Sequence, residues 1–125
     1  MSMSDVISIG ANCILQTRRN GFFLLVEIEV EAGNVDIEDF VFIRISRREA
    51  QTLMNAGVQL CQVLERFPSG AELGCVFIVD GEAFAVFDVE NNTDEAVLVR
   101  ISLAQARSLL SRGARRCTVS NRRIF

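Results

Sequence analysis

The sequence contains no histidine, lysine, tryptophan or tyrosine, so all 13 of its basic side chains are arginines. Without histidine, the chain lacks the commonest general base and metal ligand near neutral pH. Carboxylates, cysteines and arginines can still do chemistry. However, the sequence has no phosphate-binding glycine loop, no GxSxG elbow and no metal-ligand motif. It therefore gives no positive signal for an enzyme and predicts no cofactor and no metal.

Long apolar runs are missing too. None approaches the roughly 18 residues needed to cross a membrane. The opening residues, MSMSDVISIG, do not combine a basic start, an apolar segment and a small-residue cleavage site as a secretory signal does. The chain of 125 residues, half of them hydrophobic, has the usual size of one domain with a sizeable core. These features predict a single cytoplasmic domain with no membrane partner.

One stretch of the sequence occurs twice, at an offset of 56 residues. Residues 40–63 read FVFIRISRREAQTLMNAGVQLCQV, and residues 96–119 read AVLVRISLAQARSLLSRGARRCTV. This is an internal repeat, and we place the boundary between its halves at residues 66–70, which hold the only proline. The recurring positions are Arg44, Ile45, Ser46, Ala50, Leu53, Gly57, Cys61 and Val63, which reappear as Arg100, Ile101, Ser102, Ala106, Leu109, Gly113, Cys117 and Val119.

The four cysteines follow the same repeat, because Cys61 matches Cys117 and Cys13 matches Cys75. They form no CxxC pair, and there is no histidine to complete a mixed zinc site. The favoured interpretation is four small buried thiols in an intracellular core. The alternative is a pair of disulfides, or one bridge across a pseudo-twofold axis. A reactive thiol is least favoured, since neither histidine nor lysine is present to activate it.

Turn signals divide each half into strands. Asn20-Gly21 and Asp80-Gly81 predict hairpins, because such pairs readily take the positive φ values of tight turns. The strands joined by these turns are expected at residues 6–17, 22–31, 73–79 and 83–90. An acidic loop and a further strand should then follow in each half, with the loops at 32–39 and 91–95 and the strands at 40–45 and 96–101.

A short helix is predicted after the third strand of each half. Ser46-Arg47-Arg48-Glu49 and Ser102-Leu103-Ala104-Gln105 are capping boxes, in which the serine hydroxyl and the Glu or Gln side chain satisfy backbone amides. Apolar residues follow at helical spacing, and Gly57 and Gly113 indicate where the helices end. A last strand is expected in each half, over residues 58–64 and 114–119.

The predicted fold class is therefore α+β, built from two tandem β-rich repeats at about residues 5–66 and 72–120, with a tail at 121–125. Neither repeat is large enough to make more than a marginal core alone, so we expect them to pack with pseudo-twofold symmetry. We expect a barrel or sandwich whose open ends are covered by the two helices. The element order resembles, in topology alone, duplicated barrels of the double-psi class.

Arg44 and Arg100 interrupt otherwise apolar predicted strands at matching places. One interpretation is an ion pair with carboxylates on neighbouring strands. The other is an anion-binding site in which both arginines converge at the pseudo-twofold axis, because a guanidinium offers a rigid fork to carboxylate or phosphate. The carboxylates considered for the ion pairs are Glu27, Glu29, Asp88 and Glu90.

Charge is unevenly distributed, although the net charge is only −3. Residues 96–125 contain seven arginines and no acid, whereas all 16 acids lie before them. This basic end could bind nucleic-acid phosphates, or it could meet acidic residues of the same chain or of a neighbouring copy. The apolar end, Ile124-Phe125, favours contact with protein. The predicted basic contact patch is Arg107, Arg112, Arg115, Arg116, Arg122 and Arg123.

The sequence thus predicts a non-catalytic binding or self-assembling module that forms a homo-oligomer. One alternative is a small nucleic-acid-associated regulator that uses the arginine-rich C-terminal segment. Another is a small anion or ligand binder at the pseudo-twofold axis. The oligomeric state separates the first hypothesis from the other two.

Overall fold

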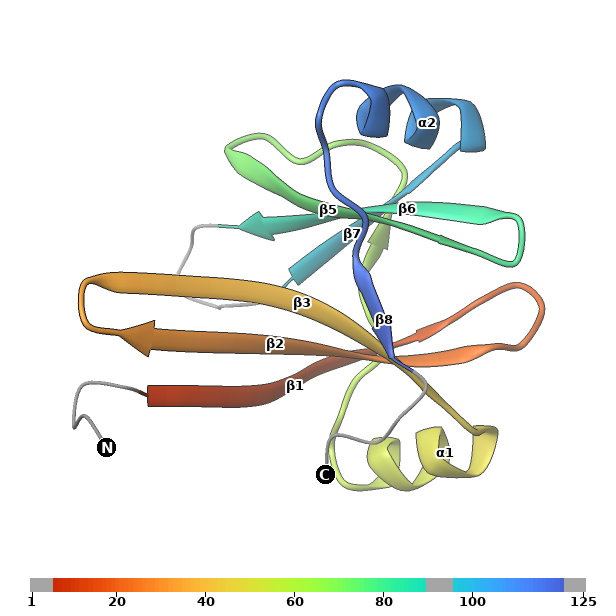
Figure 1. Cartoon of the computed structure of the whole chain (residues 1–125). Helices are drawn as coiled ribbons and strands as arrows, with labels where there is room; N and C mark the ends of the chain where they lie inside the picture. Colours follow the sequence, from red (N-terminus) through yellow and green to blue (C-terminus); the bar gives the residue numbers. More distant parts are fainter. Residues whose placement is uncertain (1–5, 90–95, 121–125) are drawn as a thin grey trace.

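The computed structural model describes residues 6–89 and 96–120, with only the backbone described at residues 6–12, 29–31, 35–38 and 89. This part of the chain forms two four-stranded sheets and two helices of nine residues each (Figure 1). The predicted α+β class is therefore confirmed. The first sheet has the order β1 (Val6–Gln16), β2 (Phe22–Ala32), β3 (Val35–Ile45), β8 (Thr118–Ser120). The second has the order β4 (Val63–Leu64), β7 (Ala96–Ile101), β6 (Glu82–Val89), β5 (Ala71–Val79).

Both predicted hairpin turns are confirmed. β1 and β2 pair antiparallel around Asn20, which has a φ of 60°. β5 and β6 pair antiparallel around Asp80 and Gly81, which have φ values of 49° and 79°. Positive φ at both central residues, the geometry whose twist matches that of two antiparallel strands, is found at Asp80-Gly81, whereas the first turn has it at Asn20 and not at Gly21.

The first acidic loop is shorter than predicted. β3 begins at Val35 rather than at residue 40, and Ala32 pairs directly with Val35 across a turn at residues 33 and 34. Gly33, with a φ of 61°, makes this tight turn accessible. The expectation failed because the acidic residues after the turn lie in a strand instead of a loop. The corresponding loop prediction at residues 91–95 lies outside the described residues.

The two helices, α1 (Arg47–Asn55) and α2 (Leu103–Ser111), start where the capping boxes predict. Both boxes are complete: each serine hydroxyl accepts a hydrogen bond from the N3 backbone amide, and the Glu or Gln side chain accepts one from the serine amide. Gly57 and Gly113 follow the helix ends with φ values of 105° and 103°, which confirms the predicted stops.

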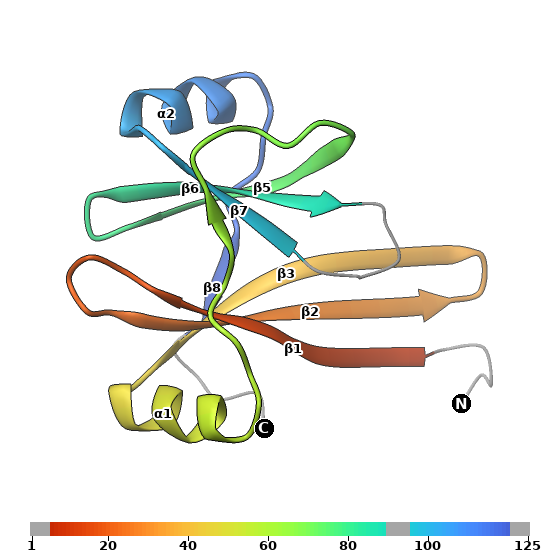
Figure 2. The same ribbon diagram turned by 180° about the vertical axis from the view of Figure 1, so that it is seen from behind.

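The two sheets pack face to face, and each helix covers the outer face of one sheet (Figures 1 and 2). Between the sheets, the Phe42 and Phe77 rings stack with centroids 4.0 Å apart, and the Phe23 ring meets Phe77 edge-on at 5.1 Å. Ala50 of α1 and Ala106 of α2 are fully buried in two further clusters on the outer faces. The prediction that the helices cover open ends is therefore wrong. Their narrow apolar stripes lie on sheet faces instead.

The last strand of each half crosses to the sheet of the other half. β4 pairs in parallel with β7, and β8 pairs in parallel with β3. Before it crosses, each segment touches its own sheet at one isolated bridge, Ile14 to Leu60 in the first half and Val76 to Arg116 in the second. Because single bridges join the sheet edges, the described residues form two sheets and not the closed barrel that was one of the two expected architectures.

All four cysteines form disulfides, which corrects the interpretation as free buried thiols. Cys13 is bonded to Cys61, and Cys75 to Cys117, with Cα atoms 4.8 and 4.9 Å apart. Each disulfide fastens a crossing segment to the edge strand of its own half, beside the isolated bridge. The cysteines of each pair are 48 and 42 residues apart in sequence, and this crossing brings them together.

Candidate functional site

The turn of the β1–β2 hairpin and the turn of the β5–β6 hairpin lie close together at one end of the molecule (Figure 1). We call these two turns the hairpin tips. Their contact centres on Glu82, the first residue of β6, whose side chain is only 10 % exposed. Glu82 Oε1 accepts a hydrogen bond from Arg100 Nη1 at 2.6 Å, within the second half. Glu82 Oε2 accepts one from the backbone amide of Arg18 at 3.0 Å, which belongs to the first half. We call Arg18, Glu82 and Arg100 the tip cluster.

Glycine at position 21 allows the two tips to approach. A Cβ placed on Gly21 would lie 3.0 Å from Thr17 Oγ1 and 3.4 Å from Asp80 Oδ2 of the opposite tip. The Gly21 amide donates to Thr17 Oγ1 at 2.9 Å, so that hydroxyl cannot move away without losing a bond. A side chain at position 21 would thus crowd Thr17 and approach Asp80 of the second tip.

The two repeated arginines pack on phenylalanine rings in the same way. The Arg44 guanidinium carbon lies 4.6 Å from the centre of the Phe23 ring, and that of Arg100 lies 5.0 Å from the Phe84 ring. Both phenylalanines lie directly opposite their arginine in the neighbouring strand and are fully buried. A guanidinium over an aromatic face is attracted by the ring and also shields it from water.

The ion-pair partner proposed for Arg100 is wrong. Its carboxylate is Glu82 rather than Asp88, which pairs with Ala96 at the far end of β7. Glu27, proposed for Arg44, lies opposite Phe40, which is four residues from Arg44 along β3. The side chains of Glu29 and Glu90 lie outside the described residues.

Arg44 and Arg100 lie at the hairpin-tip end of the same inter-sheet layer. Each shares its strand face with core residues, Phe42 beside Arg44 and Leu98 beside Arg100. The Phe23 and Phe84 rings beneath them both contact Phe77, with centroids at 5.1 and 6.4 Å. Arg100 Nη1, however, already donates to Glu82, so an anion that engages both arginines would have to share Arg100 with that carboxylate.

Four arginines of the predicted basic patch are exposed on α2 and on the segment after it. One of them, Arg115, reaches across to the first half, where Nη2 lies 3.2 Å from Asp39 Oδ1. Its Nε also donates to the Gly74 carbonyl at 3.4 Å. We call the exposed residues Arg107, Arg112, Arg115 and Arg116 the arginine surface. Arg122 and Arg123 lie outside the described residues.

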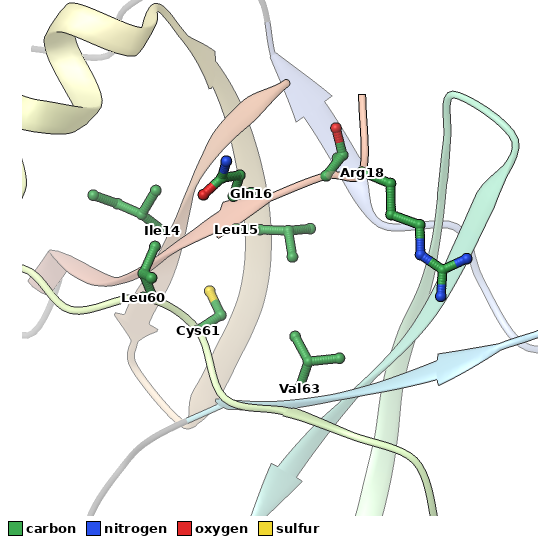
Figure 3. Close-up of a pocket in the computed structure, with 8 residues that line it drawn as sticks. Ile14, Leu15, Gln16, Arg18, Leu60, Cys61 and Val63 are labelled. Carbon is green, nitrogen blue, oxygen red and sulfur yellow. The ribbon is translucent and has the colours of Figure 1, made fainter. Parts of the chain in front are cut away.

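An open pocket of about 330 Å³ lies between β1 and the segment that leads into β4 (Figure 3). The sequence did not single out this pocket or the tip cluster. The only signal for the cluster is the position of Glu82 directly after the predicted Asp80-Gly81 turn. We call it the seam pocket, and its lining residues are Ile14, Leu15, Gln16, Thr17, Arg18, Leu60, Cys61 and Val63.

Comparison with known proteins gives no match to a family model, to a curated protein or to a solved structure. Within residues 6–89 and 96–120, no group of three or more acidic or cysteine side chains is placed to hold a metal ion. In the same part of the chain, neither helix has the length and apolar character of a membrane span. The described residues thus offer three candidate sites, which are the tip cluster, the arginine surface and the seam pocket.

Proposed function

We propose that this protein is a non-catalytic binding module that assembles with further copies of itself through the arginine surface. The observation that carries the proposal is the ion pair between Arg115 and Asp39, in which one arginine of this surface binds an acid from the other half of the chain. We infer that the other exposed arginines bind acids of a neighbouring copy through the same chemistry. Complementary charges of this kind set orientation and register more than affinity.

Acidic side chains suited to such a contact are exposed elsewhere on the molecule. Glu65 follows β4, Glu72 lies in β5, and Asp80 lies at the second hairpin tip. Because the arginines of one copy would meet acids, and not arginines, of the next copy, the proposed contact joins two different sets of residues. A contact between unlike surfaces generates a ring if the rotation closes and a filament if it does not.

We also propose that the two halves are related by a pseudo-twofold axis. The halves share their element order, their capping boxes and the placement of one disulfide each. They also exchange their last strands reciprocally, β4 for β8. These correspondences support the proposal, and the strand exchange suits a fold in which each half completes the other.

The two disulfides favour an oxidising compartment over the cytoplasm expected from the sequence. Disulfides persist in secreted and periplasmic proteins, whereas cytosolic thiols are usually kept reduced. Titrating free thiols in the denatured protein, isolated under conditions that block exchange, tests this part of the proposal. Four free thiols per chain in protein from its native compartment would restore the cytoplasmic assignment.

Self-assembly is tested by light scattering on material eluting from a size-exclusion column. We expect the wild-type mass to exceed that of a monomer at low salt and to fall at high salt, since exposed charge pairs are screened. The double variant R107E/R112E should run as a monomer. The variant R47E/R48E, which reverses two exposed arginines on α1, is the matched control and should behave as wild type. A wild-type monomer at every salt concentration, or equal behaviour of the two variants, would refute the proposal.

The arginine surface also suits a nucleic-acid regulator, because exposed arginines can neutralise phosphates. Phosphate contacts are strongest at low salt, so a gel-shift measurement there is decisive. Retention of DNA or RNA by the wild type and by R47E/R48E, but not by R107E/R112E, would favour this second function. Absence of retention at low salt would exclude it.

A further inference from the structure

The seam pocket arises because one chain segment leaves the edge of the first sheet. The Ile14 amide donates to the Gln59 carbonyl at 2.9 Å, and the Cys61 amide donates to the Ile14 carbonyl at 2.8 Å. After Cys61 the segment turns away from β1 and pairs with β7 from Val63 onward. Between Val63 and the end of β1 the two edges are therefore separated, and the pocket occupies this gap.

The floor of the seam pocket is continuous with the core between the sheets. Leu15 is buried in that core, and Cys61 and Val63 pack against it. Figure 3 shows Leu15, Cys61 and Val63 around the gap, with Leu60 and Ile14 beside them. The Cys13–Cys61 disulfide fixes one wall in place. An apolar group that enters the pocket would therefore contact the edge of this core at Leu15, Cys61 and Val63.

The rim of the seam pocket carries one positively charged side chain, that of Arg18. The Arg18 side chain is 74 % exposed, and its Nε lies 3.9 Å from Glu82 Oε1. That same oxygen is only 2.6 Å from Arg100. One carboxylate thus faces two guanidinium groups, and the closer of the two is not the one at the pocket. The Arg18 guanidinium keeps its fork of donors for a further anion.

We propose that the seam pocket binds a small amphipathic carboxylate, with its hydrocarbon chain on the apolar floor formed by Leu15, Cys61 and Val63 and its carboxylate on the Arg18 guanidinium. The size of the pocket lies at the lower end of the range typical of small-molecule sites, and an apolar lining with a single charged group is typical of them. This site is distinct from the arginine surface, so it does not depend on self-assembly.

Binding is tested by isothermal titration calorimetry of the intact, oxidised protein with octanoate below its micelle-forming concentration. We expect saturable binding of one octanoate per chain. Octanol should bind about tenfold more weakly, because it lacks the charge-assisted hydrogen bonds to Arg18, and octylammonium should not bind. From hexanoate to octanoate, affinity should rise up to about fourfold per methylene. Equal affinities for the acid, the alcohol and the amine would overturn the proposal, as would an absence of saturable octanoate binding.

Variants locate the site. Arg18→Gln leaves the backbone bond to Glu82 intact and should weaken octanoate binding about tenfold. Arg19→Gln, the exposed neighbour outside the pocket lining, is the matched control and should bind as wild type. Leu60→Glu places a negative charge at the mouth, on a residue that is 53 % exposed, and should abolish binding without unfolding the protein. Equal affinity of the two arginine variants, or full binding by a folded Leu60→Glu protein, would refute the assignment.

Discussion

In each half an arginine packs on a phenylalanine of the neighbouring strand, but among the described residues a carboxylate contact is found at Arg100 and not at Arg44. Arg44 packs on Phe23 and Arg100 packs on Phe84 in matching registers. Two residues before the phenylalanine, the second half has Glu82, whereas the first half has Gly21. The feature shared by both halves is therefore packing on an aromatic ring, whereas among the described side chains the ion pair is found in the second half alone.

The arginine–phenylalanine contact belongs to each half separately, whereas the contact of Glu82 with Arg18 joins the two halves. A guanidinium that covers a buried ring at the edge of the core explains why both halves keep an arginine. The glutamate, in contrast, reaches the backbone of the opposite hairpin at Arg18, and Gly21 leaves the space in which it does so. The asymmetric pair of residues thus serves the contact between the tips rather than either half alone.

The largest effect is expected when the disulfide of one half is removed and the loss of stability is compared between the two halves. Replacing both cysteines of one pair, as C13A/C61A or C75A/C117A, should lower the free energy of unfolding by about 4 kcal/mol each, because the closed loops have similar lengths. Urea denaturation of each variant measures this loss. Unequal losses, differing by more than about 1 kcal/mol where loop entropy predicts none, would break the equivalence of the halves.

The second test removes the residue that distinguishes the tips. Glu82→Gln keeps the size of the side chain but removes the charge that Arg100 faces, so the free energy of unfolding should fall by about 2 kcal/mol. Glu72→Gln, an exposed acid on the adjacent strand, should change it by less than about 0.5 kcal/mol. Equal losses in the two variants would mean that Glu82 contributes nothing specific to the tip contact.

The third test compares the stability lost when Arg44 is replaced with the stability lost when Arg100 is replaced. Methionine keeps the apolar contact with the ring, so Arg44→Met should lose only the cation–π term of about 0.5–1 kcal/mol. Arg100→Met also leaves Glu82 without its guanidinium and should lose about 2 kcal/mol. If the double variant unfolds at the wild-type denaturant concentration, the ion-pair explanation is contradicted and the anion-site hypothesis gains.

The smallest difference is expected at the helix caps. Ser46→Ala and Ser102→Ala each remove a hydroxyl that accepts from the N3 amide, at a cost of about 1 kcal/mol. Thermal unfolding should shift by the same amount in both variants, since the two capping boxes have the same geometry. A clear inequality would show that one helix contributes more than the other to the stability of the whole domain.

Local features were predictable from the sequence, because residues close in the chain determine them. The Asn20-Gly21 and Asp80-Gly81 turns, the capping boxes and the glycine stops all depend on neighbours within a few positions. One local error, the loop expected at residues 32–39, arose because acidic residues on a strand resemble a solvated loop; the last strands, expected at 58–64 and 114–119, are also shorter, at Val63–Leu64 and Thr118–Ser120. Val35 in fact continues the sheet directly after the turn.

Features that depend on distant partners were missed. Neither β4 nor β8 exceeds three residues, and each pairs with a strand of the other half, so no periodicity in the sequence could indicate its partner. The disulfides follow from this crossing. The contacts of Glu82 were not predicted for the same reason, since Arg18 lies 64 residues away and approaches only when the hairpin tips meet.

The reciprocal exchange of β4 and β8 has a consequence for the linker between the halves. Each disulfide joins two cysteines of the same half, so the loop around Arg66 to Gly70 is the only covalent connection between the two halves. A protease that cuts this loop would produce two separately cross-linked fragments, each still donating a strand to the other's sheet. The nicked chain would then behave as a heterodimer, and the intact protein is in this sense a dimer whose two subunits are encoded as one polypeptide.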